Sequence, residues 1–147
     1  MHYKRSWFLF MLLLSAGISM AQVGDSLVLT CPLANGSIRI IRSSDKNYKE
    51  TSEYGVMISS RFDSTVRACH EGKVVIVKAT EDKKYDLVIS FKGYYFWYAG
   101  ITAPKIKEGA KVKPGDLIGA YTPGDLLELL MFNAEEPENP RKYLKCK

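Results

Sequence analysis

The chain has 147 residues, of which 46% are hydrophobic and 25% charged, and its formal net charge is +5. This length predicts a single folded domain. Its lysines alternate with apolar residues and form no basic block, which argues against nucleic acid as a partner and leaves weak attraction to an anionic surface open.

Residues 1–21 have the pattern of a secretory signal peptide. Lys4 and Arg5 precede an apolar run over residues 7–14, and small residues stand at the cleavage-determining positions within 19–21. The alternative is a membrane anchor, but the run is shorter than the roughly 20 residues that a spanning helix needs. We therefore expect export to the periplasm or the extracellular space, no integral span after cleavage, and a mature domain over residues 22–147.

The mature domain has the pattern of a β-rich protein. Turn residues such as Asn35-Gly36, Lys92-Gly93 and Lys113-Pro114-Gly115-Asp116 separate short strand-like runs. The expected strands cover residues 37–41, 56–58, 73–78, 85–91 and 94–99. Several short strands at close spacing favour a sandwich or a barrel.

The segment from Asp125 to Met131 is ambiguous, because its leucines and glutamate are strong helix formers. Its place in the family frame described below favours a strand. The tail from Glu135 to Pro140 is expected to be an exposed loop, after which residues 141–144 dock the end of the chain.

Three cysteines remain after cleavage, and none has the spacing of a redox or zinc motif. Export places them where disulfides persist. Cys31 and Cys146 are close to the two ends of the mature domain, which often lie together, so we favour that pair. Cys69 is expected to be a small buried apolar residue. Connectivity cannot be deduced from one sequence, so other pairings stay open.

Two glycine-punctuated elements carry a family resemblance. Residues 66–74 fit Val-x-Ala-x-x-x-Gly-x-Val, and residues 109–119 fit Gly-x-x-Val-x-x-Gly-x-x-Ile-Gly. Together with the intervals between them they resemble the frame of the M23 (lysostaphin-like, LytM) peptidoglycan endopeptidases. The resemblance covers residues 32–144 and implies a mainly antiparallel β sheet or sandwich of the M23 type, related to the barrel-sandwich hybrid.

The resemblance also implies that the zinc ligands are missing. Family members bind zinc through His-x-x-x-Asp and His-x-His motifs and use further histidines for catalysis. The corresponding positions, placed by spacing, hold other residues: Glu53, Met57, Gly100, Leu127 and Leu129. Zinc requires three protein ligands and an open position for the water it activates, so we expect no metal, no cofactor and no catalytic residues at these positions.

No other constellation of catalytic residues is evident. His70, the only histidine of the mature domain, is expected to be a partly exposed structural residue, and Asp125 and Glu128 a solvated pair. No Gly-x-Ser-x-Gly element surrounds a serine. Because the metal ligands are missing, we expect apolar side chains to fill the former metal pocket as part of the core. The alternative is a groove for sugar or peptide lined by Phe96 and Tyr98, since the run from Tyr94 to Tyr98 is rich in aromatic residues.

These observations favour an exported, catalytically inactive M23-like protein that binds cell-wall peptidoglycan or regulates a wall hydrolase. One alternative is an active endopeptidase with a rearranged metal site. Another is a biotinyl- or lipoyl-like carrier module, because residues 109–119 also resemble the turn element of those domains. The latter needs a lysine at a hairpin tip, and Lys83-Lys84 lacks the usual flanking methionines.

Overall fold

The computed structural model describes residues 26–39 and 55–147. The expected signal peptide and the family position Glu53 lie outside these ranges. The elements of the described residues are β1 (Leu29–Thr30), β2 (Ser37–Arg39), β3 (Gly55–Ser59), β4 (Thr65–Arg67), β5 (Gly72–Ala79), β6 (Tyr85–Phe91), β7 (Tyr94–Ile101), β8 (Ala103–Pro104), β9 (Lys111–Val112), β10 (Leu117–Ala120), β11 (Leu127–Asn133), β12 (Glu136–Glu138), the 3₁₀ helix η1 (Pro140–Lys142) and β13 (Leu144–Lys145).

The large sheet forms one side of the molecule. Its strand order is β2-β3-β11-β7-β6-β5-β9, and β12 adds to the far end of β11. All of these pairings are antiparallel. The expected mainly antiparallel β architecture is therefore confirmed.

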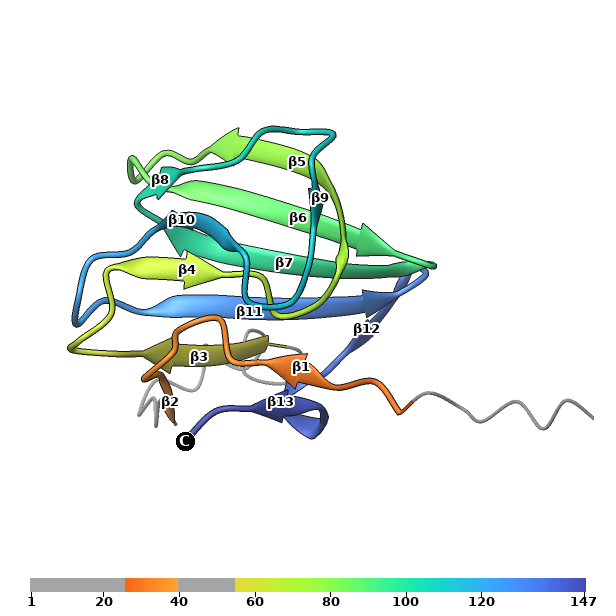
Figure 1. Ribbon diagram of the computed structural model, residues 1–147, viewed down its shortest axis with the longest axis horizontal. Helices are drawn as coiled ribbons and strands as arrows, with labels where there is room; N and C mark the ends of the chain where they lie inside the picture. Colours follow the sequence, from red (N-terminus) through yellow and green to blue (C-terminus); the bar gives the residue numbers. More distant parts are fainter. Residues whose placement is uncertain (1–25, 40–54) are drawn as a thin grey trace, which may run out of the picture.

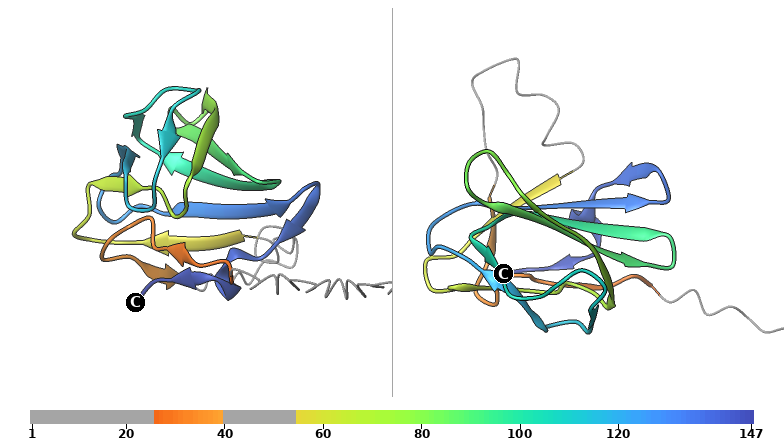
Figure 2. Two further views of the ribbon diagram at one scale, coloured as in Figure 1. Left: turned by 45° about the vertical axis from the view of Figure 1, so that its right-hand side comes forward. Right: turned by 90° about the horizontal axis from the view of Figure 1, so that it is seen from above.

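A smaller sheet, in the order β4-β10-β8, lies in front of the large sheet in Figure 1, and the view from above in Figure 2 shows the two layers. The core fills the space between them. Strand alternation directs Val74, Ile89, Phe96 and Leu129 from the large sheet into it, where they meet Ile118 of the smaller sheet; all of these residues are buried.

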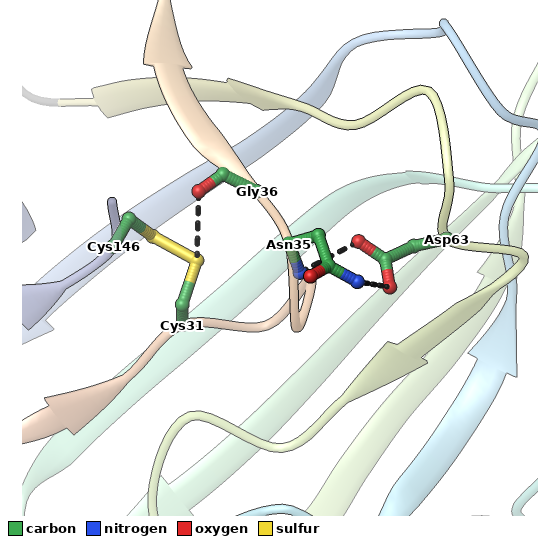
Figure 3. The surroundings of a disulfide bond; sticks show 5 residues. All are labelled: Cys31, Asn35, Gly36, Asp63 and Cys146. Carbon is green, nitrogen blue, oxygen red and sulfur yellow. Dashed lines mark hydrogen bonds between the residues drawn. A yellow bond between two sulfur atoms is a disulfide. The ribbon is translucent and has the colours of Figure 1, made fainter.

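The two ends of the described chain lie together. Strands β1 and β13 are parallel, with Leu29 opposite Leu144. Cys31 and Cys146, the pair favoured from the sequence, form a disulfide beside this contact, as Figure 3 shows. In the adjacent loop the Asp63 carboxylate accepts hydrogen bonds from the backbone and side-chain amides of Asn35, at 2.8 and 3.3 Å.

Cys69 is buried and carries a free thiol. The Tyr98 hydroxyl donates a hydrogen bond to its sulfur and accepts one from its backbone N–H, each at 2.8 Å. Burial raises the pKa of this thiol to about 12, although the hydrogen bond from Tyr98 acts in the opposite direction. A thiol held in its neutral form is a poor nucleophile.

Segment 127–133 is a strand, as the family frame predicts, despite its helix-forming residues. Its backbone pairs with β3 and β7, and such pairing outweighs local propensity. The expectation of a loop over Glu135–Pro140 is wrong, because Glu136–Glu138 pairs with β11. Pro137 lies on the edge of the sheet, where the missing N–H is tolerated.

No helix in residues 26–39 and 55–147 is long and apolar enough to cross a membrane.

Candidate binding face

The large sheet has two faces with different surroundings. One faces the core. We call the other the outer face; it carries Met57, Asp86, Ala99 and Glu128 at one end, Ile76, Val88, Trp97 and Leu130 in the middle, and Lys73, Ser90, Tyr95 and Phe132 at the far end. These positions follow from the cross-strand register of β3, β11, β7, β6 and β5. All of these residues are at least partly exposed except Val88, which is 2% exposed.

Phe96 and Tyr98 do not line an open groove. Both are completely buried between the two sheets, and Tyr98 is held by its hydrogen bonds to Cys69. The expectation of a groove at these two residues is therefore wrong. Residues on one strand alternate between faces, so the exposed aromatic side chains of β7 are the intervening ones, Tyr95 and Trp97.

The ligand positions inferred by spacing also need correction. Leu127 and Leu129 are completely buried in the core, whereas Met57 is half-buried on the outer face. Residues that bind one metal ion must lie on one face, so these three positions cannot represent one ancestral site. The residue of β11 directly opposite Met57 is Glu128. We therefore assign Glu128, not its leucine neighbours, to the outer-face position beside Met57.

Gly100 differs from the family histidine in its backbone as well as in its side chain. Its φ is +104°, a conformation that L-residues rarely adopt. A Cβ atom added there would lie 2.8 Å from the backbone oxygen of Leu126. A histidine therefore cannot occupy this position without a shift of the backbone.

The remaining candidate residues have structural roles. His70 packs against Phe91 and Phe96, with ring centroids 4.7 and 5.2 Å apart. Asp125 and Glu128 do not act as a pair, because Asp125 forms a salt bridge of 3.2 Å with Lys84. The same salt bridge involves Lys84, one of the two lysines considered for the attachment site of a carrier module.

The described residues near the former metal position do not fit zinc. Met57, Glu128 and Ala99 are neighbours across three strands and together offer one carboxylate. Across the described part of the chain, no three His, Cys, Asp or Glu side chains are close enough to hold a metal ion. Zinc sites in proteins use three or four such ligands.

The middle and far end of the outer face form an aromatic and aliphatic surface. Trp97 and Phe132 have ring centroids 6.4 Å apart and are tilted by 49°. Tyr95 and Ile76 are each 40% exposed, and Leu130 is half-buried. The aromatic density of β7 is evident in the sequence, but the two side chains predicted to line a groove, Phe96 and Tyr98, are the inward-facing ones. The polar residue Glu128 between two leucines was the available signal for the outward direction on β11.

Glu128 is a half-buried carboxyl group within this surface. Its burial and the neighbouring negative charge of Asp86 both raise its pKa. Asp86 and Glu128 are both partners of Ala99, on either side of β7.

Hydrogen bonds hold the loops at this end of the sheet. The Tyr121 hydroxyl accepts from the Ser60 backbone N–H at 3.1 Å, and it also contacts the carbonyl oxygen of Asp125. The N–H of Gly124 donates to the carbonyl of Ser60 at 2.7 Å. These bonds connect the β3–β4 and β10–β11 loops beside Met57 and Glu128, so this end of the outer face has a fixed border.

Comparison with protein families identifies the class of domain that this fold and these positions define. The model of peptidase family M23 matches residues 51–134, more than half of the chain. The chain therefore belongs to peptidase family M23, as a degenerate member whose described residues include no group of three side chains that could hold a metal ion. Comparison with curated proteins gives no significant match.

Several solved structures share the fold. Csd3 from Helicobacter pylori matches with a TM-score of 0.65 and 21% identity, over 83% of this chain and 36% of that chain. A chain of the SpoIIQ–SpoIIIAH pore-forming complex matches with a TM-score of 0.63 and 16% identity, over 82% of this chain and 92% of that chain. Lysostaphin matches with a TM-score of 0.58 and 17% identity, over 80% of this chain and 53% of that chain. The chain thus spans about a third of the Csd3 structure, and these similarities concern the fold alone.

Proposed function

We propose that the chain is exported after removal of residues 1–21 and that residues 22–147 form a binding protein that attaches to cell-wall peptidoglycan without hydrolysing it. The observation that carries this proposal is the outer face. There Trp97, Phe132 and Tyr95 present aromatic surface on the same face as Met57, the residue at which the family resemblance puts a zinc-ligand position.

Binding is supported by the chemistry of the surface. Aromatic side chains with one accessible face contribute large apolar area and stack on the apolar faces of sugars and peptides. Trp97, Leu130 and Phe132 come from two adjacent strands that are paired along their length. They are thus held in position before a ligand arrives, which lowers the entropic cost of binding.

Inactivity is supported by the ligand chemistry. Hydrolysis by this family depends on a water molecule that zinc activates, and zinc needs several nitrogen, oxygen or thiolate ligands around one point. At the outer-face positions of β3 and β11, Met57 offers a thioether and Glu128 a single carboxylate. The conformation of Gly100 also disfavours a histidine at that point.

A second candidate is a protein partner, such as a wall hydrolase that this domain regulates. It is favoured by one comparison: a chain of the same fold, matched over 92% of its length, belongs to the SpoIIQ–SpoIIIAH complex. Such a partner would use the same aromatic face, because aromatic residues dominate the energetics of protein interfaces.

Co-sedimentation with purified peptidoglycan tests the proposal. Residues 22–147, which retain every described residue, should pellet with the polymer, and Trp97→Ala and Phe132→Ala should reduce the bound fraction. Phe62→Ala is the matched control, because Phe62 is 85% exposed but lies in the β3–β4 loop outside the outer face. Equal binding by all four proteins, each folded by circular dichroism, would reject the outer face as the binding surface.

A further inference from the structure

The turn between β1 and β2 contains a chemically labile pair of residues. Asn35 precedes Gly36, and no other asparagine of the chain precedes a glycine. In such a pair the backbone nitrogen of glycine can attack the side-chain carbonyl carbon of asparagine, because no Cβ atom on the glycine hinders the approach. Asn35 is exposed, so water reaches its side chain. The pair is therefore a candidate site of covalent modification.

Contacts from distant parts of the chain keep both residues in place. A Cβ atom added to Gly36 would lie 2.8 Å from the Ile58 side chain and 2.9 Å from the Leu33 carbonyl oxygen, so no larger residue fits there without a shift. The Asp63 carboxylate accepts hydrogen bonds from the backbone N–H and the side-chain amide of Asn35, at 2.8 and 3.3 Å. Packing thus requires the glycine, and the Asp63 carboxylate favours the asparagine.

The same contacts oppose the reaction in the folded state. The Gly36 N–H donates a hydrogen bond of 2.8 Å to the Leu33 carbonyl, although this nitrogen must lose its proton when it attacks. The Asn35 amide is directed toward Asp63, as Figure 3 shows. The reaction therefore needs a local opening that breaks these bonds, and its rate follows the population of the open form.

Modification would change the environment of Asp63. This residue is 9% exposed, and Asn35 donates two hydrogen bonds to its carboxylate. Conversion of the Asn35 amide to a carboxylate removes the side-chain donor and puts a second negative charge beside the first. Because Asp63 belongs to the β3–β4 loop, the modified chain has a weaker connection between this loop and the β1–β2 turn.

We propose that Asn35-Gly36 is a modification site at which the chain converts Asn35 to aspartyl and isoaspartyl residues, and that the Asp63 carboxylate slows this conversion. A bond forms between the Gly36 nitrogen and Cγ of Asn35 while the Cγ–Nδ2 bond breaks, and the proton of the Gly36 N–H leaves with Nδ2 as ammonia. Water then adds to either carbonyl carbon of the cyclic imide, which gives aspartate or isoaspartate. This inference goes beyond the proposed function, because it involves no ligand of the outer face.

Peptide mapping by mass spectrometry measures the reaction directly, because replacement of the amide by a carboxylate changes the mass of the peptide that contains Asn35. Residues 22–147 are incubated at mildly alkaline pH in native buffer and in urea, and the two isomeric products are separated by chromatography. Conversion of Asn35 should be at least about tenfold slower in native buffer than in urea. Asn133, which precedes Ala134, is the internal control and should react more slowly than Asn35 in urea.

Variants of Asp63 test its role. Asp63→Ala should raise the native rate at least about fivefold and leave the rate in urea unchanged. Asp63→Asn, which keeps the size of the side chain, should raise the native rate by a smaller factor, and it replaces Asp63→Ala in the comparison if the latter does not fold by circular dichroism. Asp82→Ala is the matched control and should change neither rate, because Asp82 is an exposed residue of the β5–β6 turn.

A substitution reproduces the aspartyl product. Asn35→Asp should raise the unfolding equilibrium constant about tenfold, because a hydrogen bond to a charged group is replaced by repulsion. Asn133→Asp is the matched control, since Asn133 is exposed at the end of β11, and it should change this constant little. Urea denaturation measures both constants.

Three results would overturn the inference. The first is the absence of modified Asn35 from every folded protein, including the Asp63 variants, after conversion in urea is complete. The second is a native rate in the folded Asp63 variants equal to that of the parent protein. The third is an unfolding constant of Asn35→Asp equal to that of the parent protein.

Discussion

Met57 and Glu128 are directly opposite each other on β3 and β11, whereas Leu129, the next residue of β11, is buried on the other side of the sheet. This relationship fixes which positions of the degenerate site share a face. It also puts a thioether and a carboxylate side by side on the outer face.

The first prediction concerns this register. Met57→His with Glu128→His places two imidazoles on neighbouring strands of one face, where Cβ atoms are about 5 Å apart and can share a zinc ion. Zinc at 1 mM should raise the unfolding free energy of this variant by about 1 kcal/mol through mass action. Urea denaturation with and without zinc measures the effect.

The control for this experiment is Met57→His with Leu129→His. It should gain no stability from zinc, and it should lose about 2 to 5 kcal/mol because a buried leucine has been replaced. Zinc stabilisation of this second variant, and not of the first, would show that the register of β11 is wrong.

The second prediction concerns Gly100. Gly100→Ala should destabilise the fold by more than about 1 kcal/mol, because strain at positive φ is combined with a contact of 2.8 Å to the Leu126 oxygen. Gly109→Ala is the control, since Gly109 also has positive φ but has open space around its Cβ position. Chemical denaturation that finds equal losses for the two variants would contradict the close contact.

The architecture could be predicted from the sequence because it depends on local features, such as turn residues and alternating runs, that are visible in a single sequence. Glycines such as Gly115, which has φ +87°, mark turns. Alternating runs such as Tyr85–Phe91 mark strands, and that strand has the predicted bounds. The M23 frame also resolved the ambiguous segment after Asp125, which local propensity alone would have assigned to a helix.

The candidate site was harder to predict from the sequence, because an error of one residue in the assignment of a strand moves every side chain to the opposite face of the sheet. Spacing placed Leu127 and Leu129 beside Met57, but only the pairing of β11 with β3 shows that Glu128 occupies that place. The same slip assigned Phe96 and Tyr98 to a groove when Trp97 was the outward residue. Cross-strand register depends on contacts between distant segments, which one sequence does not display.

The third prediction concerns the disulfide between Cys31 and Cys146. These residues are 115 positions apart, so the bridge closes a long loop and can contribute up to about 4.7 kcal/mol in the chain-entropy model. Cys31→Ser with Cys146→Ser should lower the urea midpoint accordingly. Non-reducing peptide mapping of the parent protein should find this bridge, and a native bridge that contains Cys69 would contradict it.

The fourth prediction concerns the Cys69 thiol. Its pKa rises from 9.0 to about 12 on folding, so the folded state retains a proton that the unfolded state loses between these values. Its contribution to stability is complete below pH 9 and falls as the pH rises toward 12, by about 1.4 kcal/mol for each pH unit. Cys69→Ala should therefore show a smaller loss of stability than the parent protein over this range.

The experiment on Cys69 compares how steeply the unfolding free energy of each protein falls with pH. Absolute free energies are not compared, because Cys69→Ala also removes the sulfur that accepts the Tyr98 hydrogen bond. Equal slopes for the two proteins above pH 9 would show that the thiol is not held neutral by burial. Reaction of Cys69 with a thiol reagent under native conditions, as fast as in urea, would lead to the same conclusion.

We propose that this M23 domain binds the wall polymer without cleaving it, and one assay measures both binding and cleavage. Residues 22–147 are incubated with purified peptidoglycan and added zinc, the polymer is pelleted, and both bound protein and soluble fragments are quantified, with an active M23 peptidase as a positive control. We predict protein in the pellet and no fragments above the level of a protein-free sample. Fragment release that persists in repeated preparations and is abolished by Glu128→Gln would contradict the claim.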